Sequence, residues 1–410
     1  MKNYIKLLST NRSFLLIMLS DLLSNAGDIL FTIALSWTVL ERTKSILLTS
    51  ILFILKYLSQ SFCSIFSGLL ADRFSRKKLL IISMLSQAFI LFPFMILIRM
   101  DYTKYLCIIF PILFILYLFS TLAKHTQNVM IPDIVSKDDL VTANSVDIIL
   151  NRVVGVGMLA VAGFLTSVLK ITTIVFIDII TFLIPAGLLY FFLPDVKLNE
   201  NLNITREDPC KNKWLQELKE GWQYICSDTF VFNFLFLLVF LNFPYSIMNI
   251  FPLAYVNKVL NGPASSYGII KSVIFASTLL SMYVIGSNKI FSERSATFFS
   301  VGLLGSGFVM LFFSPIFSNT IVTASILFFI YNFFDTLTQP LFINLRGRIP
   351  SSVRGRVLGI FDAIVVFVIP VFTFVGGFIM DNLDIRKVAI IVSIFLLFFG
   401  VYSIKLKLIE

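Results

Sequence analysis

Long apolar runs separated by short polar stretches dominate the chain. Twelve runs fall at about 13–38, 46–69, 79–99, 105–123, 142–168, 171–193, 229–256, 264–287, 295–314, 317–340, 356–380 and 387–405. A helix needs about 20 apolar residues to cross roughly 30 Å of hydrocarbon. Strands of a membrane barrel would instead be short and would alternate between apolar and polar residues. The pattern therefore predicts an all-α membrane protein with twelve transmembrane helices.

One long polar stretch, 194–228, follows the sixth run and divides the chain in two. It predicts an N-terminal six-helix bundle (1–193), a cytoplasmic linker (194–228) and a C-terminal six-helix bundle (229–410). Within the linker, the apolar positions of the segment that begins at Trp214 recur at helical spacing. We expect an amphipathic helix there that lies on the membrane surface.

Composition supports a membrane protein. The chain is 58% hydrophobic, holds 45 phenylalanines and a single histidine, and its mean hydropathy is +0.92. The net charge of +10 does not indicate nucleic acid, because no basic domain exists outside the apolar runs. Lys and Arg are instead concentrated in the loops on the same side as the N-terminus. The positive-inside rule then predicts a multi-pass cell-membrane protein with both termini in the cytoplasm.

The residue types needed for catalysis or metal binding do not group together in the sequence. Cys63, Cys107, Cys210 and Cys226 show no paired spacing. There is no Ser/His/Asp set, phosphate-binding loop or metal-ligand cluster. We expect no metal, no cofactor and no enzymatic activity, and we expect a monomer.

A charged segment joins the second and third apolar runs. It reads G-L-L-A-D-R-F-S-R-K-K from Gly68 to Lys78. It resembles the loop between helices 2 and 3 of the major facilitator superfamily of secondary transporters, G-x-L-A-D-R-x-G-R-R/K-x-x-L. The one departure is Ser75, where the family pattern has glycine.

The resemblance implies two pseudo-symmetric six-helix bundles that rock about a central cavity and so expose it to each side of the membrane in turn. It also implies a conformational latch in this loop, where an acidic residue and the basic residues after it hold helix ends together. The latch residues would be Gly68, Asp72, Arg73, Arg76 and Lys77. After the fourth and tenth runs, Ile131–Val135 and Ile349–Val353 are similar to each other, in keeping with a repeat of two halves.

Further segments are similar to the branch that contains macrolide-efflux proteins and siderophore exporters. They are Asn25–Asp28 with Trp37–Ser45, Pro132–Asp133 with Ala143–Asn144, Glu217–Gly221, and Arg354–Val357 with Pro370 and Gly376–Gly377. The antiporter signature of helix 5 is incomplete, since Gly155, Gly157 and Gly163 are present without the proline. Export is therefore implied by the branch and not by an intact antiporter motif.

Ionisable residues inside apolar runs are costly, so each needs a partner or a function. Asp21 and Asp28 lie two turns apart on nearly one face of the first helix, about 10 Å along its axis. That helix lines the central cavity in the superfamily. A carboxyl that takes up a proton on one side of the membrane and releases it on the other can couple transport to a proton gradient. Asp335 and Asp362 are the corresponding candidates in the second half.

Other polar residues within the runs are candidates for the substrate cavity. The full set of cavity candidates is Asp28, Lys56, Arg152, Asn242, Tyr245, Asn249, Lys271 and Asn332. Arg152 is alternatively a structural partner of Asp147 or Asp21. Asp178 is expected to have a packing or gating role, and His125 to lie in a loop.

Together these features predict a proton-coupled antiporter that exports small amphipathic molecules, such as macrolide-type drugs, by alternating access. Its partners would be the substrate, protons and the lipid bilayer. Two alternatives remain open: export of an anionic siderophore, which the membrane-embedded cations favour, and lipid flipping.

Overall fold

The computed structural model of the protein describes residues 7, 10–100, 106–136, 139–194, 211–313 and 319–405, without the side chains at 64, 65, 67–73, 211–218, 346 and 352. It divides into two compact units, residues 1–201 with 263–272 and residues 202–262 with 273–410. The division passes through one helix, α10 (Ala264–Ser287).

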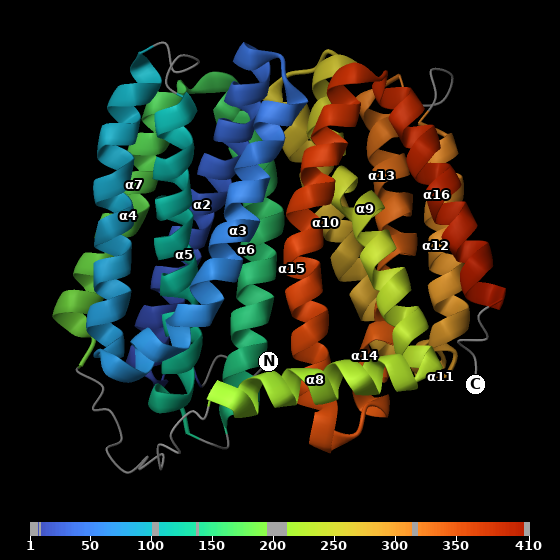
Figure 1. The fold of residues 1–410 in the computed structure, drawn as a ribbon. Helices are drawn as coiled ribbons and strands as arrows, with labels where there is room; N and C mark the ends of the chain where they lie inside the picture. Colours follow the sequence, from blue (N-terminus) through green and yellow to red (C-terminus); the bar gives the residue numbers. More distant parts are fainter. Residues whose placement is uncertain are drawn as a thin grey trace. The chain divides into compact units, whose positions relative to one another are not determined.

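Every regular element in the described residues is a helix (Figure 1). The first unit contains α2 (Arg12–Thr43), α3 (Ile46–Arg73), α4 (Arg76–Arg99), α5 (Leu106–Ile134), α6 (Leu140–Val168), α7 (Ile171–Phe192) and the start of α10. The second contains α8 (Lys211–Ser227), α9 (Thr229–Lys258), the rest of α10, α11 (Ile290–Glu293), α12 (Ser295–Leu311), α13 (Ile321–Thr336), α14 (Gln339–Arg348), α15 (Ser351–Asn382) and α16 (Ile385–Lys405).

The helices are long and apolar enough to cross a membrane. Among the described residues, eleven candidate spans meet this criterion, one of them running from α13 into α14, and α12 is a shorter apolar helix. Large side chains such as Phe89, Phe191 and Phe367 are more than two-thirds exposed. Lipid would cover them, since a water-exposed surface of this kind is not found on soluble monomers. The all-α, twelve-helix fold class is confirmed.

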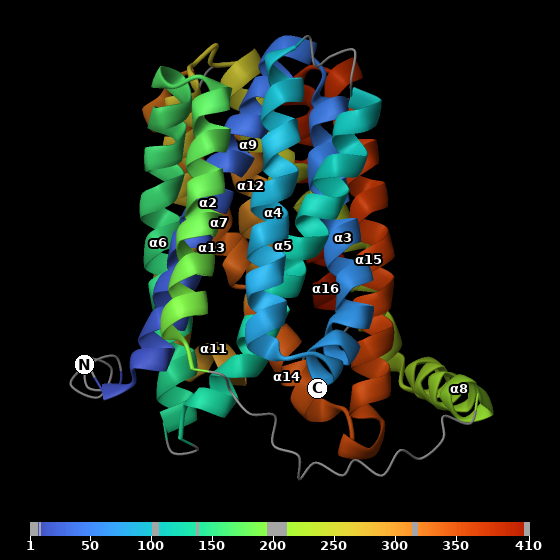
Figure 2. The same ribbon diagram turned by 90° about the vertical axis from the view of Figure 1, so that its left-hand side faces the viewer.

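In the first unit, α2 packs against α6 and α7, α3 packs against α5, and α4 stands between α5 and α7 (Figure 2). Its apolar core forms two main clusters along α2. One includes Phe14, Ile17 and Met18, and the other includes Phe31 and Leu35. The stretch of α2 between these clusters carries the polar residues predicted to have a function. The fold thus holds polar side chains between two apolar layers.

Local contacts fix where α2 begins and ends. The side chain of Asn11 accepts a hydrogen bond from the backbone N–H of Phe14 (3.0 Å). Its amide also donates to the carbonyl of Ile134 at the end of α5 (2.6 Å). At the other end, Lys44 adopts a left-handed conformation (φ 55°) and its N–H bonds to the carbonyl of Leu40. Asp28 therefore lies well inside this helix and not near its end.

Two predicted helix ends are wrong. The fourth apolar run predicts a helix that ends at residue 123, with Ile131–Val135 in the segment after the helix. In the structure, α5 continues through Ile134 and includes Pro132. The polar residues after 123 do not stop the helix, because helix propensity depends weakly on polarity, and Pro132 lies in its last turn. In the second half, α13 ends at Thr336 and a separate helix, α14, follows it.

Small residues allow α6 and the first part of α10 to approach closely. A Cβ atom added to Gly163 would lie 2.6 Å from the Cα of Gly268, and a Cβ atom added to Gly268 would lie 2.6 Å from the Cα of Gly163. Nearby, the hydroxyl of Ser272 donates to the carbonyl of Val156 (3.1 Å). Close backbone packing at small residues is typical of helices in membranes.

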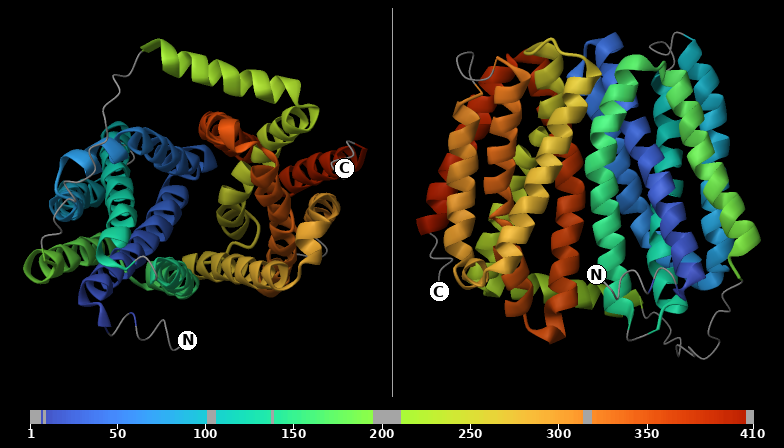
Figure 3. Two further views of the ribbon diagram at one scale, coloured as in Figure 1. Left: turned by 90° about the horizontal axis from the view of Figure 1, so that it is seen from below. Right: turned by 180° about the vertical axis from the view of Figure 1, so that it is seen from behind.

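In the second unit, α9 packs against α15, and α12 packs against α13 and α16. Phe251, Tyr255, Phe313 and Phe328 form an aromatic cluster with ring centroids 4.7–6.1 Å apart. Helix α8 runs crosswise to α9 and α15 (Figure 3). An ion pair between Glu220 and Arg356 joins it to α15. A helix is present where the amphipathic pattern predicted one.

Candidate functional site

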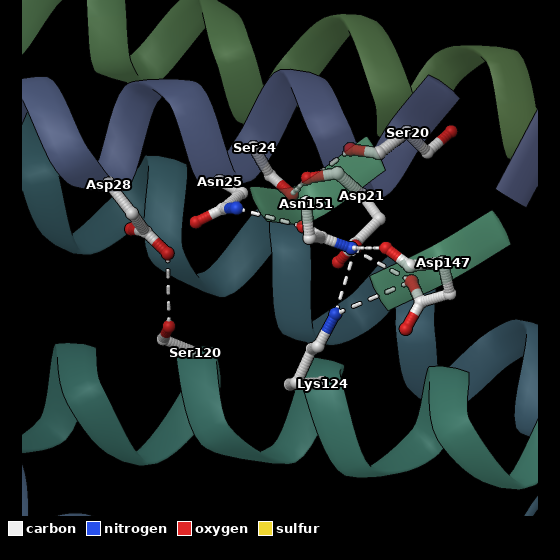
Figure 4. A network of polar contacts seen from close by, with 9 residues as sticks. All are labelled: Ser20, Asp21, Ser24, Asn25, Asp28, Ser120, Lys124, Asp147 and Asn151. Atoms are coloured by element: carbon white, nitrogen blue, oxygen red, sulfur yellow. Dashed lines mark hydrogen bonds and ion pairs between the residues drawn. The ribbon is translucent and has the colours of Figure 1, made fainter. Parts of the chain in front are cut away.

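The main polar cluster of the first unit is centred on Asp21 of α2 (Figure 4). Its Oδ2 atom accepts hydrogen bonds from Nζ of Lys124 on α5 and from Nδ2 of Asn151 on α6, each at 2.8 Å. The Asp21 side chain is 7% exposed and that of Lys124 is 44% exposed. The carboxylate is thus paired with a cation that reaches it from a more open position.

Asn151 joins this ion pair to two further residues. Its amide nitrogen also donates to Oδ1 of Asp147, one turn earlier on α6 (2.8 Å). Its amide oxygen accepts from Nδ2 of Asn25 on α2 (2.8 Å). Nζ of Lys124 lies 4.0 Å from Oδ1 of Asp147, so two carboxylates share one ammonium group. We call Asp21, Asn25, Lys124, Asp147 and Asn151 the Asp21 network.

Asp28 lies on the same helix, two turns along from Asp21. Its Oδ2 atom accepts a hydrogen bond from the hydroxyl of Ser120 on α5 (3.2 Å; Figure 4). The ammonium group of Lys56 on α3 attracts this carboxylate, and Asp21 repels it. Lys56 and Asp28, both cavity candidates from the sequence, are therefore close enough to interact.

A further carboxyl, Asp178 on α7, is completely buried against α2. The hydroxyl of Thr181 donates to its backbone carbonyl (2.8 Å) and to its Oδ1 atom (3.2 Å). Gly27 leaves space for these two side chains, because a Cβ atom at residue 27 would overlap both of them. The glycine beside Asp28 thus allows a second carboxyl to lie against α2.

Arg152 and Lys271, the other cationic candidates, are half-buried on α6 and α10. Nζ of Lys271 lies 5.8 Å from the centre of the Tyr267 ring, a distance compatible with a cation–π contact. Lys124, which the sequence did not single out as a partner, is bonded to Asp21. His125, one residue later, is half-buried within α5 and not in a loop.

The candidates of the second unit do not form a comparable network among the described contacts. Asn332 on α13 donates to the hydroxyl of Thr278 (2.8 Å) and to the carbonyl of Ile274 (3.0 Å), both on α10. Asp335 is half-buried one residue before the end of α13. Asp362 is exposed on α15.

The candidates on α9 differ in exposure. Asn242 is buried, and its amide donates to the carbonyl of Leu238 in the same helix (2.7 Å). Tyr245 is 48% exposed and Asn249 is half-buried. The amide of the buried residue therefore bonds within its own helix.

The predicted latch is described in part. The side chains of Gly68, Asp72 and Arg73 lie outside those that the structure describes, although these residues form the last turns of α3. Arg76, at the start of α4, forms an ion pair with Asp133 near the end of α5. Lys77 donates to the carbonyl of Leu193, just after α7. These two cations tie the ends of three helices together.

Sequence reasoning missed Lys124, Asn151 and Ser120. Lys124 lies just past residue 123, where the fourth run predicts a helix end, whereas α5 continues through Ile134. Asn151 could have been found from its spacing, because Asp147 and Asn151 are four residues apart and lie on one helix face. No local signal marks Ser120, whose partner is distant in the sequence.

Among the described residues, no group of three or more His, Cys, Asp or Glu side chains is arranged to hold a metal ion. The arrangement is instead one of carboxyls, lysines and amides within membrane-spanning helices. Such groups can hold a proton, an ion or a polar part of a solute.

A sequence profile of the Major Facilitator Superfamily matches residues 17–364. The chain belongs to this superfamily. The match spans both units and includes the Asp21 network, Asp28 and the loop after α3. No curated protein matches the sequence.

Solved structures share the fold at low sequence identity. The nucleoside transporter NupG is 13% identical with a TM-score of 0.74, and 96% of this chain and 98% of that one are covered. A bacterial homologue of the iron transporter ferroportin in an inward-facing state is 15% identical (TM-score 0.67, coverage 96% and 98%). A bacterial homologue of the human lysosomal transporter Spinster is 12% identical (TM-score 0.69, coverage 96% and 96%). The chain is thus a multi-pass membrane transporter by family and fold.

Proposed function

We propose that this transporter is a proton-coupled antiporter that exports small amphipathic molecules by alternating access. The observation that carries the proposal is the set of membrane-embedded carboxyls in the first unit. Asp21, Asp28 and Asp147 interact there with two lysines, Lys56 and Lys124. A carboxyl at membrane depth is costly when it is ionised. Binding a proton relieves that cost, so the site favours proton uptake.

Within this set, Asp28 is the best candidate for the coupling proton. Asp21 is hydrogen-bonded to both Lys124 and Asn151, and hydrogen bonds from such donors compensate a negative charge. Asp28 has a single serine hydroxyl bonded to it and a lysine at longer range. Its negative charge is less compensated, so its protonation costs less. Asp335 and Asp362 are secondary candidates, since the described contacts give them no comparable network.

Alternating access would use the latch around Asp72. The contacts of Arg76 with Asp133 and of Lys77 with Leu193 support this role, because they bind the ends of α4, α5 and α7 into one body. A rocking bundle must move as such a body. Gly68, Asp72 and Arg73 would complete the latch. The cytoplasmic linker 194–228 would join the six-helix bundles 1–193 and 229–410.

The substrate class follows from the chemistry of the candidate cavity residues and from the branch resemblance. Tyr245, Asn249 and Asn332 supply acceptors and donors on α9 and α13, which are rich in phenylalanine, and Asp28 supplies a carboxyl on α2. Apolar walls with a few polar groups suit amphipathic solutes such as macrolide-type drugs. The fold neighbours include a nucleoside transporter and a bacterial homologue of an iron transporter, so the fold alone does not select a substrate.

Export of an anionic siderophore is the second candidate. Lys56, Arg152 and Lys271 favour it, since three cationic side chains within the spans can attract a negatively charged solute. A lipid flippase is a third possibility within the same fold. For each of these functions we propose a monomer in the cell membrane, with both termini in the cytoplasm.

The test is transport by purified protein in liposomes with an imposed pH gradient. A macrolide, an iron-free catecholate siderophore and a fluorescent phospholipid are offered separately. We expect gradient-driven movement of the macrolide in the wild type and its loss in Asp28→Asn. Asp139→Asn is the matched control, because Asp139 lies before α6 and its carboxylate accepts from Ser136 outside the network.

The outcomes separate the candidates. Movement of the siderophore alone would support the second function, and movement of the phospholipid alone the third. Macrolide transport that is independent of the pH gradient, or that is retained in an Asp21→Asn/Asp28→Asn double variant, would contradict proton coupling through these residues.

A further inference from the structure

A cavity of about 250 Å³ lies at one end of the second unit. Its wall is formed by the first turn of α9, by the junction of α11 and α12, and by α14. Helices α11 and α14 lie at the end of the unit where α9 begins (Figure 1). The apolar helices α9 and α12 both start at this cavity, so it lies at the level where a membrane protein meets the polar headgroups of the bilayer.

Two arginines line this cavity. Arg294 is the residue between α11 and α12, and Arg348 is the last residue of α14. The Cζ atom of Arg348 lies 4.3 Å from the centre of the Phe230 ring at the start of α9, which is a cation–π distance. Two positive charges from separate helices therefore border one space.

Hydrogen bonds from Asn344 fix the α11–α12 junction against α14. Its amide nitrogen donates to the backbone carbonyl of Ser292 (2.7 Å) and to the hydroxyl of Ser295 (2.8 Å). Asn344 and Ser295 also line the cavity. Because Arg294 lies between the two residues that this amide holds, its backbone is fixed at the cavity wall.

The lining combines buried apolar side chains with exposed polar ones. Ala296, Leu341 and Leu345 line the cavity and are 7%, 3% and 2% exposed. The charged and amide side chains of the lining are exposed: Glu293, Arg294, Asn344 and Arg348. The cavity thus has a charged rim and an apolar floor, which suits a ligand with one anionic group and a short organic part.

The negative charges near the arginines do not cancel both of them. Glu293 lines the cavity beside Arg294, but no ion pair joins these two residues among the contacts of the described chain. Asp228 is not in the lining, and its Oδ1 atom accepts from the N–H groups of Phe230 and Val231 at the start of α9. The lining therefore has two cations and one carboxylate.

Guanidinium groups bind phosphate through paired N–H donors, and basic pockets at the ends of membrane-spanning helices suit phospholipid headgroups. A volume of about 250 Å³ is below the roughly 300–1,000 Å³ of pockets for drug-sized ligands. We propose that this cavity binds an anionic phosphate ester, with the phosphate on Arg294 and Arg348 and the ester group on the apolar floor. The ester is the headgroup of an anionic phospholipid or a soluble compound of the same chemistry, and the experiment separates these two sources.

A phosphate bound there ties the first turns of α9 and α12 to the last turn of α14. The proposed site contains no residue of the Asp21 network. It does not depend on the proposed substrate or on proton coupling.

The test uses the purified full-length protein in a neutral detergent, with native mass spectrometry to count bound molecules. Phosphatidic acid, phosphatidylcholine and glycerol 3-phosphate are titrated separately. We expect the wild type to bind phosphatidic acid more tightly than the zwitterionic phosphatidylcholine. Arg294→Gln and Arg348→Gln should each weaken phosphatidic acid binding by about tenfold, since a hydrogen bond to a charged group is lost. Glu293→Gln should strengthen it, because a like charge is removed.

Lys405→Gln is the matched control, because Lys405 is exposed in the last turn of α16 and does not line the cavity. It removes one positive charge and should leave phosphatidic acid binding unchanged. Equal binding by the wild type and Arg294→Gln would overturn the proposal, and so would equal weakening in Lys405→Gln. If Arg348→Gln does not fold without its contact to Phe230, Arg294→Gln decides, since that side chain is exposed.

The probes also identify the source of the phosphate. Phosphatidic acid binding that glycerol 3-phosphate does not displace assigns the site to a lipid headgroup. Binding of glycerol 3-phosphate with the same dependence on Arg294 assigns it to a soluble phosphate ester. If the wild type binds neither anionic ester, the proposal is wrong, whereas the transport test of the proposed function keeps its own outcome.

Discussion

At the scale of single residues, the carboxyls within the membrane-spanning helices of the first unit differ in their hydrogen-bond partners. Asp21 is held by a lysine and an amide, Asp28 by a serine, and Asp178 by a threonine on one oxygen. Their different partners predict different readiness to take up a proton.

The close fit at Gly27 gives a first prediction about stability. Gly27→Ala should lower the free energy of unfolding by about 1–3 kcal/mol, the usual cost of overpacking, because its Cβ would overlap Thr181 and Asp178. The measurement is thermal unfolding of the purified protein in detergent. Gly157→Ala is the control, since nothing lies within 4 Å of the added atom there. Equal melting temperatures for the two variants would contradict the close α2–α7 contact.

The ion pair between Asp21 and Lys124 gives a second prediction. Lys124→Met alone should destabilise the protein more than the double variant Asp21→Asn/Lys124→Met, because the single change leaves a buried carboxylate unpaired. Since Lys124 is 44% exposed, we expect a difference of about 1–2 kcal/mol, below the roughly 3–5 kcal/mol of fully buried pairs. A double-mutant cycle by thermal unfolding measures it. Additive effects would show that the pair does not matter for stability.

At the scale of elements, helix ends decide which residues can act together. Because α5 continues to Ile134, it carries both Lys124 in the network and Asp133 beside the loop that follows α3. One helix therefore connects the proposed proton site with the proposed latch. The same extension makes the C-terminal end of α5 available to Asn11 and Arg76.

The contact between α4 and α5 predicts the outcome of a charge exchange. Arg76→Asp should abolish transport in liposomes, since two carboxylates would then face each other at the ends of these helices. The double variant Arg76→Asp/Asp133→Arg should restore most of it. Thermal unfolding of the same samples shows whether the single variant is folded. If the double variant folds but does not transport, the contribution of Arg76 to transport does not depend on its ion pair with Asp133.

At the scale of the whole molecule, the distribution of Lys and Arg among the loops predicts the orientation in the membrane. A fluorescent protein that matures only in the cytoplasm should be bright when it is fused to the N-terminus or to the C-terminus. A phosphatase that is active only outside the cytoplasm should be inactive when it is fused to either terminus. The opposite result at either end would contradict the predicted topology. The proposed coupling direction would then have to be reversed, because the latch would lie outside the cell.

The sequence by itself determined the number of membrane-spanning helices, the helix on the linker and the superfamily. These properties depend on the local succession of apolar and polar residues, which the bilayer selects directly through the cost of exposing polar groups. The segment from Gly68 to Lys78 carried the family resemblance for the same reason, since its residues are contiguous in the sequence.

The tertiary structure alone decided which polar residues meet. Lys124 and Asn151 lie 103 and 130 positions from Asp21 in the sequence, and no periodicity within one helix predicts that they share a carboxylate. Asp178 was expected to pack or to gate. Its position against Gly27, with one oxygen unpaired, follows from how closely α7 approaches α2. Packing between helices sets such distances, because a missing side chain on one helix makes room for a carboxyl on another.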